Sequence, residues 1–109
     1  MNIMLPDNIN MIVQKTVTTI TEVVKPVKIF LFGSAVNNTF HSNSDLDFLV
    51  VAPNGTNKRK TSQEIYRKLV DVGFASDIIV ITQDDLKTYR DDSNYIIKTA
   101  ITEGELVYG

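Results

Sequence analysis

The stretch DLDFLVV, residues 45–51, places two carboxylates at the start of an apolar run. Apolar runs of this kind are typical of β-strands, and in a strand residues i and i+2 point to the same face. Asp45 and Asp47 therefore project side by side, while Leu46 and Phe48 face the other way. Asp is disfavoured in strands and adjacent like charges repel each other, so the pair requires an explanation.

A second apolar stretch, DIIVI at residues 77–81, also begins with a carboxylate. One explanation for Asp77 and for the pair above is that all three lie at exposed strand ends or cap turns. The other is that a divalent cation neutralises them. Ligand sets made only of oxygen suit Mg²⁺ or Mn²⁺, which usually also hold water and substrate phosphates.

Gly33 and Ser34 follow the apolar segment 28–32 and precede a polar stretch. A glycine at the end of a strand lets a phosphate approach the backbone, and exposed N–H groups together with a hydroxyl can hold it. A plain strand-to-loop turn is the alternative. The spacing adds information, because ten residues separate Ser34 from Asp45.

The remaining segments follow from apolar periodicity and from helix-end signals. We expect helices over 9–24, 61–72, 82–90 and 93–104, strands over 28–32, 45–52, 77–82 and 106–108, and loops over 37–44 and 54–60. Expected helix starts are Asp7, the capping box Thr61-x-x-Glu64, Thr82 and Ser93, and expected ends are Pro26, Gly73 and Gly104. This order predicts a single α/β (α+β) domain over residues 1–109, with helices packed against one small mixed sheet.

Composition excludes several classes of protein. The 109 residues carry a net charge of −2, are 43% hydrophobic and contain no cysteine. A disulfide scaffold and a thiolate metal site are therefore excluded, and a free-standing nucleic-acid binder usually has a basic excess. No apolar run approaches the roughly 20 residues of a membrane span. The first residues show no secretory signal, so we expect a cytoplasmic protein without membrane or direct nucleic-acid partners.

The motifs together resemble those of a known family. Phe32-Gly33-Ser34 followed by residues 44–50 resembles the signature of the polymerase-beta-type nucleotidyltransferases, and residues 77–80 resemble the strand that bears their third carboxylate. The short length and the ten-residue spacer are similar to the minimal nucleotidyltransferases (MNT), the antitoxins paired with HEPN toxins. The resemblance implies the nucleotidyltransferase fold and an ATP-binding, magnesium-dependent transferase.

The resemblance also implies a role for each site residue. Asp45 and Asp47 would hold two Mg²⁺ ions, and Asp77 would ligate one of them and orient or deprotonate the acceptor hydroxyl. Gly33 and Ser34 would hold the β- and γ-phosphates of ATP. Two cations at such a site clamp the attacking and leaving oxygens of an in-line displacement.

One departure from the family pattern concerns charge. Members often carry a basic residue shortly after Gly-Ser, whereas residues 35–38 here are Ala-Val-Asn-Asn. By charge alone, Lys28 and the triplet 58–60 are candidates to replace it. The alternative for the triplet is a solvated loop.

Three functions are compatible with this sequence. The first is an antitoxin that transfers AMP from ATP to a hydroxyl of a partner protein, a tyrosine of a HEPN toxin, with which it forms a hetero-oligomer. The second is a binding module with a weak or inactive site that neutralises its partner by occlusion. The third is a nucleotidyltransferase that acts on a small molecule.

Overall fold

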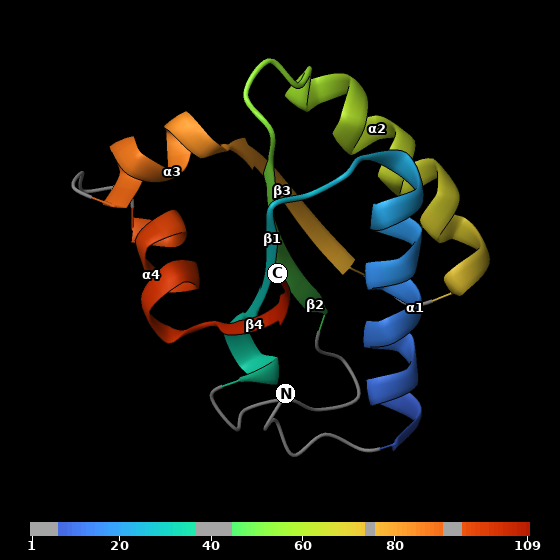
Figure 1. Cartoon of the computed structure of the whole chain (residues 1–109). Helices are drawn as coiled ribbons and strands as arrows, with labels where there is room; N and C mark the ends of the chain where they lie inside the picture. Colours follow the sequence, from blue (N-terminus) through green and yellow to red (C-terminus); the bar gives the residue numbers. More distant parts are fainter. Residues whose placement is uncertain (1–6, 37–44, 74–75, 91–94) are drawn as a thin grey trace.

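The computed structural model describes residues 7–36, 45–73, 76–90 and 95–109, which form helices and strands (Figure 1). The elements are α1 (Asp7–Val23), β1 (Lys28–Phe32), the 3₁₀ helix η1 (Gly33–Ala35), β2 (Leu46–Ala52), α2 (Lys58–Leu69), the 3₁₀ helix η2 (Val70–Val72), β3 (Ser76–Thr82), α3 (Gln83–Arg90), α4 (Tyr95–Glu103) and β4 (Glu105–Tyr108). Among these described helices, none is both long and apolar enough to cross a bilayer.

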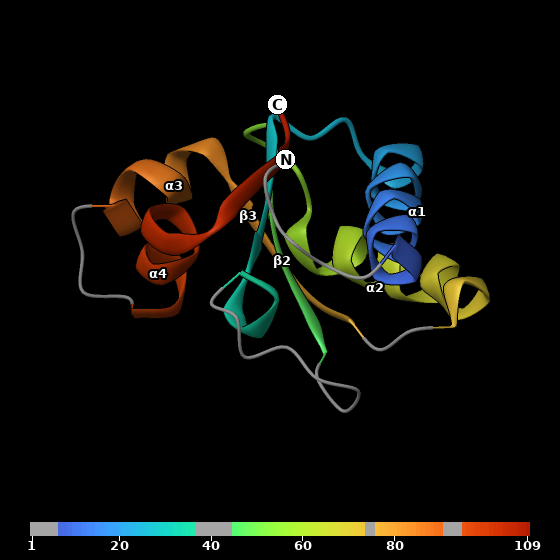
Figure 2. The same ribbon diagram turned by 90° about the horizontal axis from the view of Figure 1, so that it is seen from below.

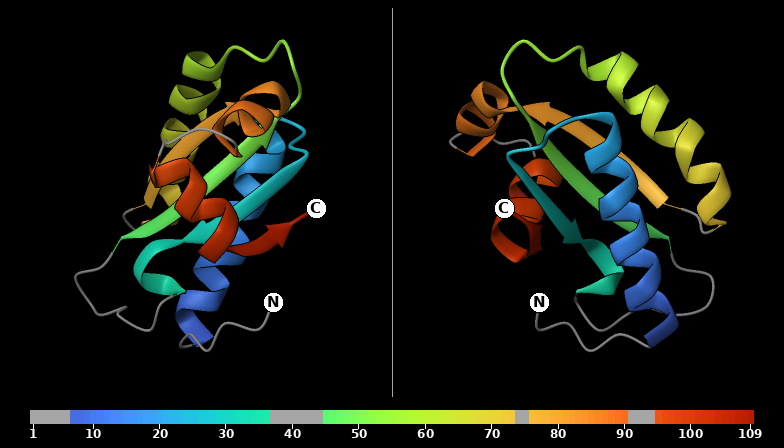
Figure 3. Two further views of the ribbon diagram at one scale, coloured as in Figure 1. Left: turned by 90° about the vertical axis from the view of Figure 1, so that its left-hand side faces the viewer. Right: turned by 45° about the vertical axis from the view of Figure 1, so that its right-hand side comes forward.

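The strands form one mixed sheet in the order β3-β2-β1-β4. Strand β1 is antiparallel to β2 and β4, whereas β2 and β3 are parallel. As a result, β1 ends where β2 and β3 begin, and η1 lies at that end of the sheet (Figure 3). The mixed sheet confirms the predicted α+β class.

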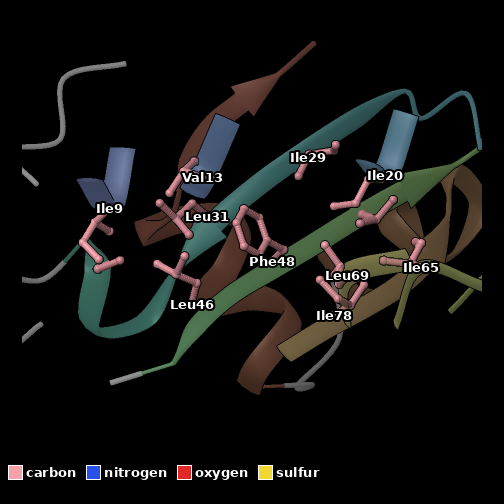
Figure 4. Close-up of a cluster of buried hydrophobic side chains, with 12 residues drawn as sticks. Ile9, Val13, Ile20, Ile29, Leu31, Leu46, Phe48, Ile65, Leu69 and Ile78 are labelled. Carbon is pink, nitrogen blue, oxygen red and sulfur yellow. The ribbon is translucent and has the colours of Figure 1, made fainter. Parts of the chain in front are cut away.

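Helices cover both faces of the sheet, with α1 and α2 on one face and α3 and α4 on the other (Figures 1 and 2). The central strand β2 contributes to both layers, because its side chains alternate between the faces. Leu46, Phe48 and Val50 join the cluster under α1 and α2, part of which is drawn in Figure 4. Leu49 and Val51 join the second cluster, which includes Ile97 of α4.

Helix α1 forms although residues 16–21 are rich in β-branched side chains, which are poor helix formers. The hydroxyl of the fully buried Thr16 donates to the Ile12 carbonyl at 2.8 Å, so this polar group is satisfied inside the helix. The apolar face of α1 packs onto the sheet and supplies the stabilisation that propensity does not.

The predicted start of the second long helix is wrong by one turn. Asn57, rather than Thr61, caps α2, because its side-chain oxygen accepts the Lys60 backbone N–H at 3.0 Å. The expected loop over 54–60 is therefore helical from Lys58 onward. The other end of this segment agrees with the prediction, since Gly73 adopts a left-handed conformation with φ of 75°.

The predicted cap at Thr82 is confirmed. The Asp85 backbone N–H donates to the Thr82 hydroxyl at 3.2 Å, and the Thr82 N–H donates to the Asp85 carboxylate at 3.1 Å. This reciprocal pair starts α3 directly after β3. The predicted cap at Ser93 and the loop over 37–44 lie outside the described residues.

Replacing Phe48 with Ala should test the importance of the central strand. Phe48 is fully buried, so its removal leaves a cavity that should lower the free energy of unfolding by about 3–5 kcal/mol. Val70→Ala is the control, because Val70 is 75% exposed and should change stability by only about 0.5 kcal/mol. Urea titration of both variants makes the comparison. Similar losses in the two would contradict this assignment of the core.

Candidate functional site

Two of the three aspartates stand side by side at one end of the sheet. Asp47 and Asp77 are the second residues of β2 and β3, and the parallel register pairs them directly. Because Leu46 and Phe48 pack under α1 and α2, Asp47 points to the opposite face, the one that carries α3 and α4. Its register partner Asp77 points to the same face.

The proximity of these carboxylates changes the protonation of one of them. The pKa of Asp47 is raised from 3.8 to about 6, first by its burial and then by the charge of Asp77, a hydrogen bond with Asp77 and the charge of Asp45. Each cause disfavours the ionised form of Asp47. The end of the sheet therefore concentrates negative charge in a place where a cation would relieve the repulsion.

Asp45 takes a more marginal position than the sequence predicts. The strand begins at Leu46, so Asp45 lies just before β2 and is exposed. It acts on Asp47 through its charge. Within the described part of the chain, no three acidic, histidine or cysteine side chains gather closely enough to hold a metal by themselves. The structure thus brings Asp47 and Asp77 together and leaves Asp45 exposed, just before the start of β2.

Gly33 lies against the same carboxylate. Phe32 pairs with Asp47 across β1 and β2, so the residue after Phe32 passes the Asp47 side chain. Gly33 has a φ of +78°, which disfavours other residues, and a Cβ at this position would overlap the Asp47 carboxylate. Glycine is therefore needed both for the turn and for the close approach of the backbone to Asp47.

The turn after Gly33 is short and anchored. The Val36 N–H donates to the Gly33 carbonyl at 3.1 Å and closes the 3₁₀ turn, and Ala35 is buried. Ser34, between them, is partly exposed. The sequence prediction that Gly33 and Ser34 follow a strand and open a turn is confirmed, and the turn adjoins the aspartates.

The basic residues proposed by charge alone lie at the wrong end of the sheet. Lys28 pairs with Val51, four residues along β1 from Phe32, which is about 13 Å away at the usual strand rise. Lys58 follows the far end of β2, and its ammonium group binds the Asp85 carboxylate at 2.8 Å. This partner helps to lower the pKa of Asp85. Neither lysine replaces the basic residue missing after Ser34.

The chemistry of the aspartate pair fits a magnesium ion. Mg²⁺ prefers hard oxygen ligands and is often held by one or two carboxylates, with the remaining positions taken by waters and substrate phosphates. Asp47 and Asp77 provide two such ligands, and across the described ranges no lysine or arginine forms an ion pair with them. A hollow of about 730 Å³ lies elsewhere, lined by α1, the end of α2 and η2, and none of the three site aspartates lines it.

Comparison with known proteins connects this geometry to one family. The family model described as "Nucleotidyltransferase domain" matches residues 13–107. No curated protein matches. A crystal structure of a mutant toxin-antitoxin MntA-HpeT matches with a TM-score of 0.65 and 22% identity, over 88% of this chain and 72% of that chain. A crystal structure of a toxin-antitoxin with AMP-PNP matches with a TM-score of 0.59 and 22% identity, over 88% and 73%. At this identity the likeness shows a shared fold.

The carboxylate pair should make stability depend on pH. A folded-state pKa above the ordinary value of 3.8 means that Asp47 favours folding while it is protonated, and that this contribution is lost as the pH rises through about 6. Asp47→Asn mimics the protonated form. The variant should therefore be more stable than wild type at pH 7.5 in EDTA and about equally stable near pH 4.

Chemical denaturation at both pH values, with Asp71→Asn as the control, measures this difference. Asp71 is exposed and lies in η2, away from the sheet end. If Asp47→Asn were less stable than wild type at pH 7.5, burial and the neighbouring carboxylates would not disfavour the ionised form of Asp47.

Proposed function

Because this chain belongs to the nucleotidyltransferase domain family, we propose that it transfers AMP from ATP to a hydroxyl group of a partner protein. One observation carries the proposal. The Asp47–Asp77 pair and the Gly33 turn meet at the same end of the sheet, so the carboxylates lie directly beside the backbone of a strand-end turn. A triphosphate with its divalent cation requires this combination.

The phosphate side of the site would be the turn after β1. The turn at Gly33, whose φ is +78°, would present backbone groups to the β- and γ-phosphates, and the partly exposed Ser34 offers a hydroxyl. The carboxylates of Asp45, Asp47 and Asp77 would hold Mg²⁺, with two ions expected from the family resemblance. Bound there, the metal would offset negative charge on the triphosphate and on the departing pyrophosphate.

The acceptor side would be Asp77. It is exposed and belongs to the edge strand β3, so a large acceptor can reach it. The acceptor hydroxyl oxygen would attack the α-phosphorus, the bond from that phosphorus to the bridging oxygen would break, and pyrophosphate would leave. The Asp77 carboxylate would orient the hydroxyl and accept its proton.

We propose that the acceptor is a tyrosine of a HEPN-type toxin and that this chain is its antitoxin in a hetero-oligomer. Support comes from the resemblance of the Gly-Ser and Asp-x-Asp motifs to those of minimal nucleotidyltransferases. Further support is that two solved structures with this fold are toxin-antitoxin structures, one of them with AMP-PNP.

Neutralisation by occlusion is the second candidate function. The observation that favours it is the missing cationic contact, since Lys28 and Lys58 lie at the opposite end of the sheet from Gly33. A domain that holds the triphosphate weakly could still cover the active surface of a toxin. Transfer and occlusion therefore have to be separated by variants that lose one and keep the other.

Gly33→Ala should weaken ATP binding measured by titration calorimetry with Mg²⁺. The new methyl group would overlap the Asp47 carboxylate, so we expect at least a tenfold loss of affinity. Gly73→Ala is the matched control. Its φ of +75° gives a similar backbone cost of roughly 1–2 kcal/mol, but among the described residues no atom beyond its chain neighbours lies within 4 Å of the added Cβ. Equal ATP affinity in the two variants would remove Gly33 from the phosphate site.

Asp77→Asn should separate transfer from binding. The amide keeps the size of the side chain but loses the charge that accepts a proton, so transfer of AMP should fall by roughly 100-fold or more while the partner still co-purifies. Intact mass of the partner after incubation with ATP and Mg²⁺ measures the transfer. Asp84→Asn is the control, because Asp84 is an exposed carboxylate in the first turn of α3, beyond the far end of β3.

Growth rescue at equal expression provides the cellular comparison. We expect wild type and Asp84→Asn to rescue cells from the toxin and Asp77→Asn to fail. Full rescue by Asp77→Asn, with no mass change on the partner for any variant, would establish occlusion instead of transfer.

A further inference from the structure

A tyrosine outside the sequence motifs binds the backbone beside Asp77. The Ile78 N–H donates to the Tyr66 hydroxyl at 2.8 Å, and that hydroxyl donates to the Ile78 carbonyl at 3.4 Å. One side chain thus satisfies both backbone polar groups of one residue. The contact spans 12 residues of sequence and joins α2 to β3.

The contact lies on the open side of the sheet. Strand β3 is an edge strand, whose inner neighbour is β2. In a parallel pair, successive residues direct their N–H and C=O groups alternately toward and away from the neighbouring strand. Since Ile78 directs its groups to Tyr66, those of Asp77 are directed to β2. Asp77 is therefore held on the inner side by β2 and, through the next residue, on the outer side by Tyr66.

Asp77 needs such support because of its place in the strand. It is the second residue of β3, and strand ends at the edge of a sheet open more easily than central strands. A group that must face both a cation and an acceptor hydroxyl loses efficiency when it shifts by even about 1 Å. In the proposed function, the Asp77 carboxylate must therefore be placed accurately, although its backbone lies at a weakly constrained strand end.

Helix α2, which carries Tyr66, is anchored in the hydrophobic core. The neighbouring residue Ile65 is fully buried, and Leu69, one turn later, packs in the same cluster as Ile78 (Figure 4). Tyr66 itself remains 42% exposed. Its specific contribution is the hydroxyl at the edge of β3.

We propose that Tyr66 is a positioning residue of the nucleotidyl-transfer site, whose hydroxyl fixes the backbone at Ile78 and thereby the direction of the Asp77 carboxylate. The inference rests on the proposed function, because Asp77 is assigned there to the acceptor and the metal. Tyr66 itself contacts neither substrate nor metal in this assignment.

Tyr66→Phe tests the proposal, because it removes only the hydroxyl. Tyr108→Phe is the matched control: Tyr108 is 40% exposed and lies on β4, the opposite edge strand. We expect the Ile78 amide of Tyr66→Phe to exchange with deuterium about five- to tenfold faster, because this amide loses its hydrogen-bond acceptor. We expect kcat for AMP transfer to fall about tenfold while the KM for ATP changes less than twofold. The control should match wild type in all three measurements.

Two results would overturn the proposal in an active enzyme. Unchanged Ile78 exchange would show that the hydroxyl does not hold the strand, and faster exchange with unchanged kcat would show a merely structural bond. A wild-type protein that transfers no AMP would contradict the proposed function instead. In that case Mn²⁺ binding decides the positioning role. About fivefold weaker binding by Tyr66→Phe than by Tyr108→Phe would support it, and equal binding would overturn it.

Discussion

Repulsion between two carboxylates, set by the register of two parallel strands, is the constraint on which this site depends. Asp47 and Asp77 occupy paired positions, and burial together with this neighbour raises the pKa of Asp47 to about 6. No lysine or arginine of the described residues forms an ion pair with either carboxylate, so the pair lowers the stability of the fold at neutral pH. A divalent cation brought by a triphosphate would turn the repulsion into attraction, so we interpret the pair as a site that is complete only when substrate is bound.

The rest of the structure holds this pair in place. Residues 48–52 of β2 are fully buried between the two helical layers, so the strand that bears Asp47 cannot shift without disrupting both cores. Strand β1 brings Gly33 to the same end because it runs antiparallel to β2. Strand β3 is less constrained, since it is at the edge, and there α2 contributes the Tyr66 hydroxyl. In the proposed transfer, the rigid strand β2 would support the metal and phosphate side of the site, and the Tyr66 hydroxyl would support the acceptor side.

Much of this arrangement is predictable from the sequence, because its signals are local. The i, i+2 spacing of Asp45 and Asp47, the apolar segment 28–32 and the turn at Gly33 each depend on a few neighbouring residues. Pairing between distant segments is not local. The sequence does not reveal that Phe32 and Asp77 flank Asp47. Tyr66 was missed for the same reason, since its spacing on α2 carries no signal for a bond to β3.

The central claim is that a cation and a triphosphate bind together where β1 ends and β2 and β3 begin. Paramagnetic broadening of backbone amide signals by Mn²⁺ in the presence of ATP tests it most directly, because the effect reports distance from the ion. The account predicts strong, selective loss of the Gly33, Asp47 and Asp77 signals, while those of Lys58 and Asp85 at the far end stay sharp. Broadening centred on Asp85, or no broadening at the aspartate pair at saturating Mn²⁺ and ATP, would contradict it.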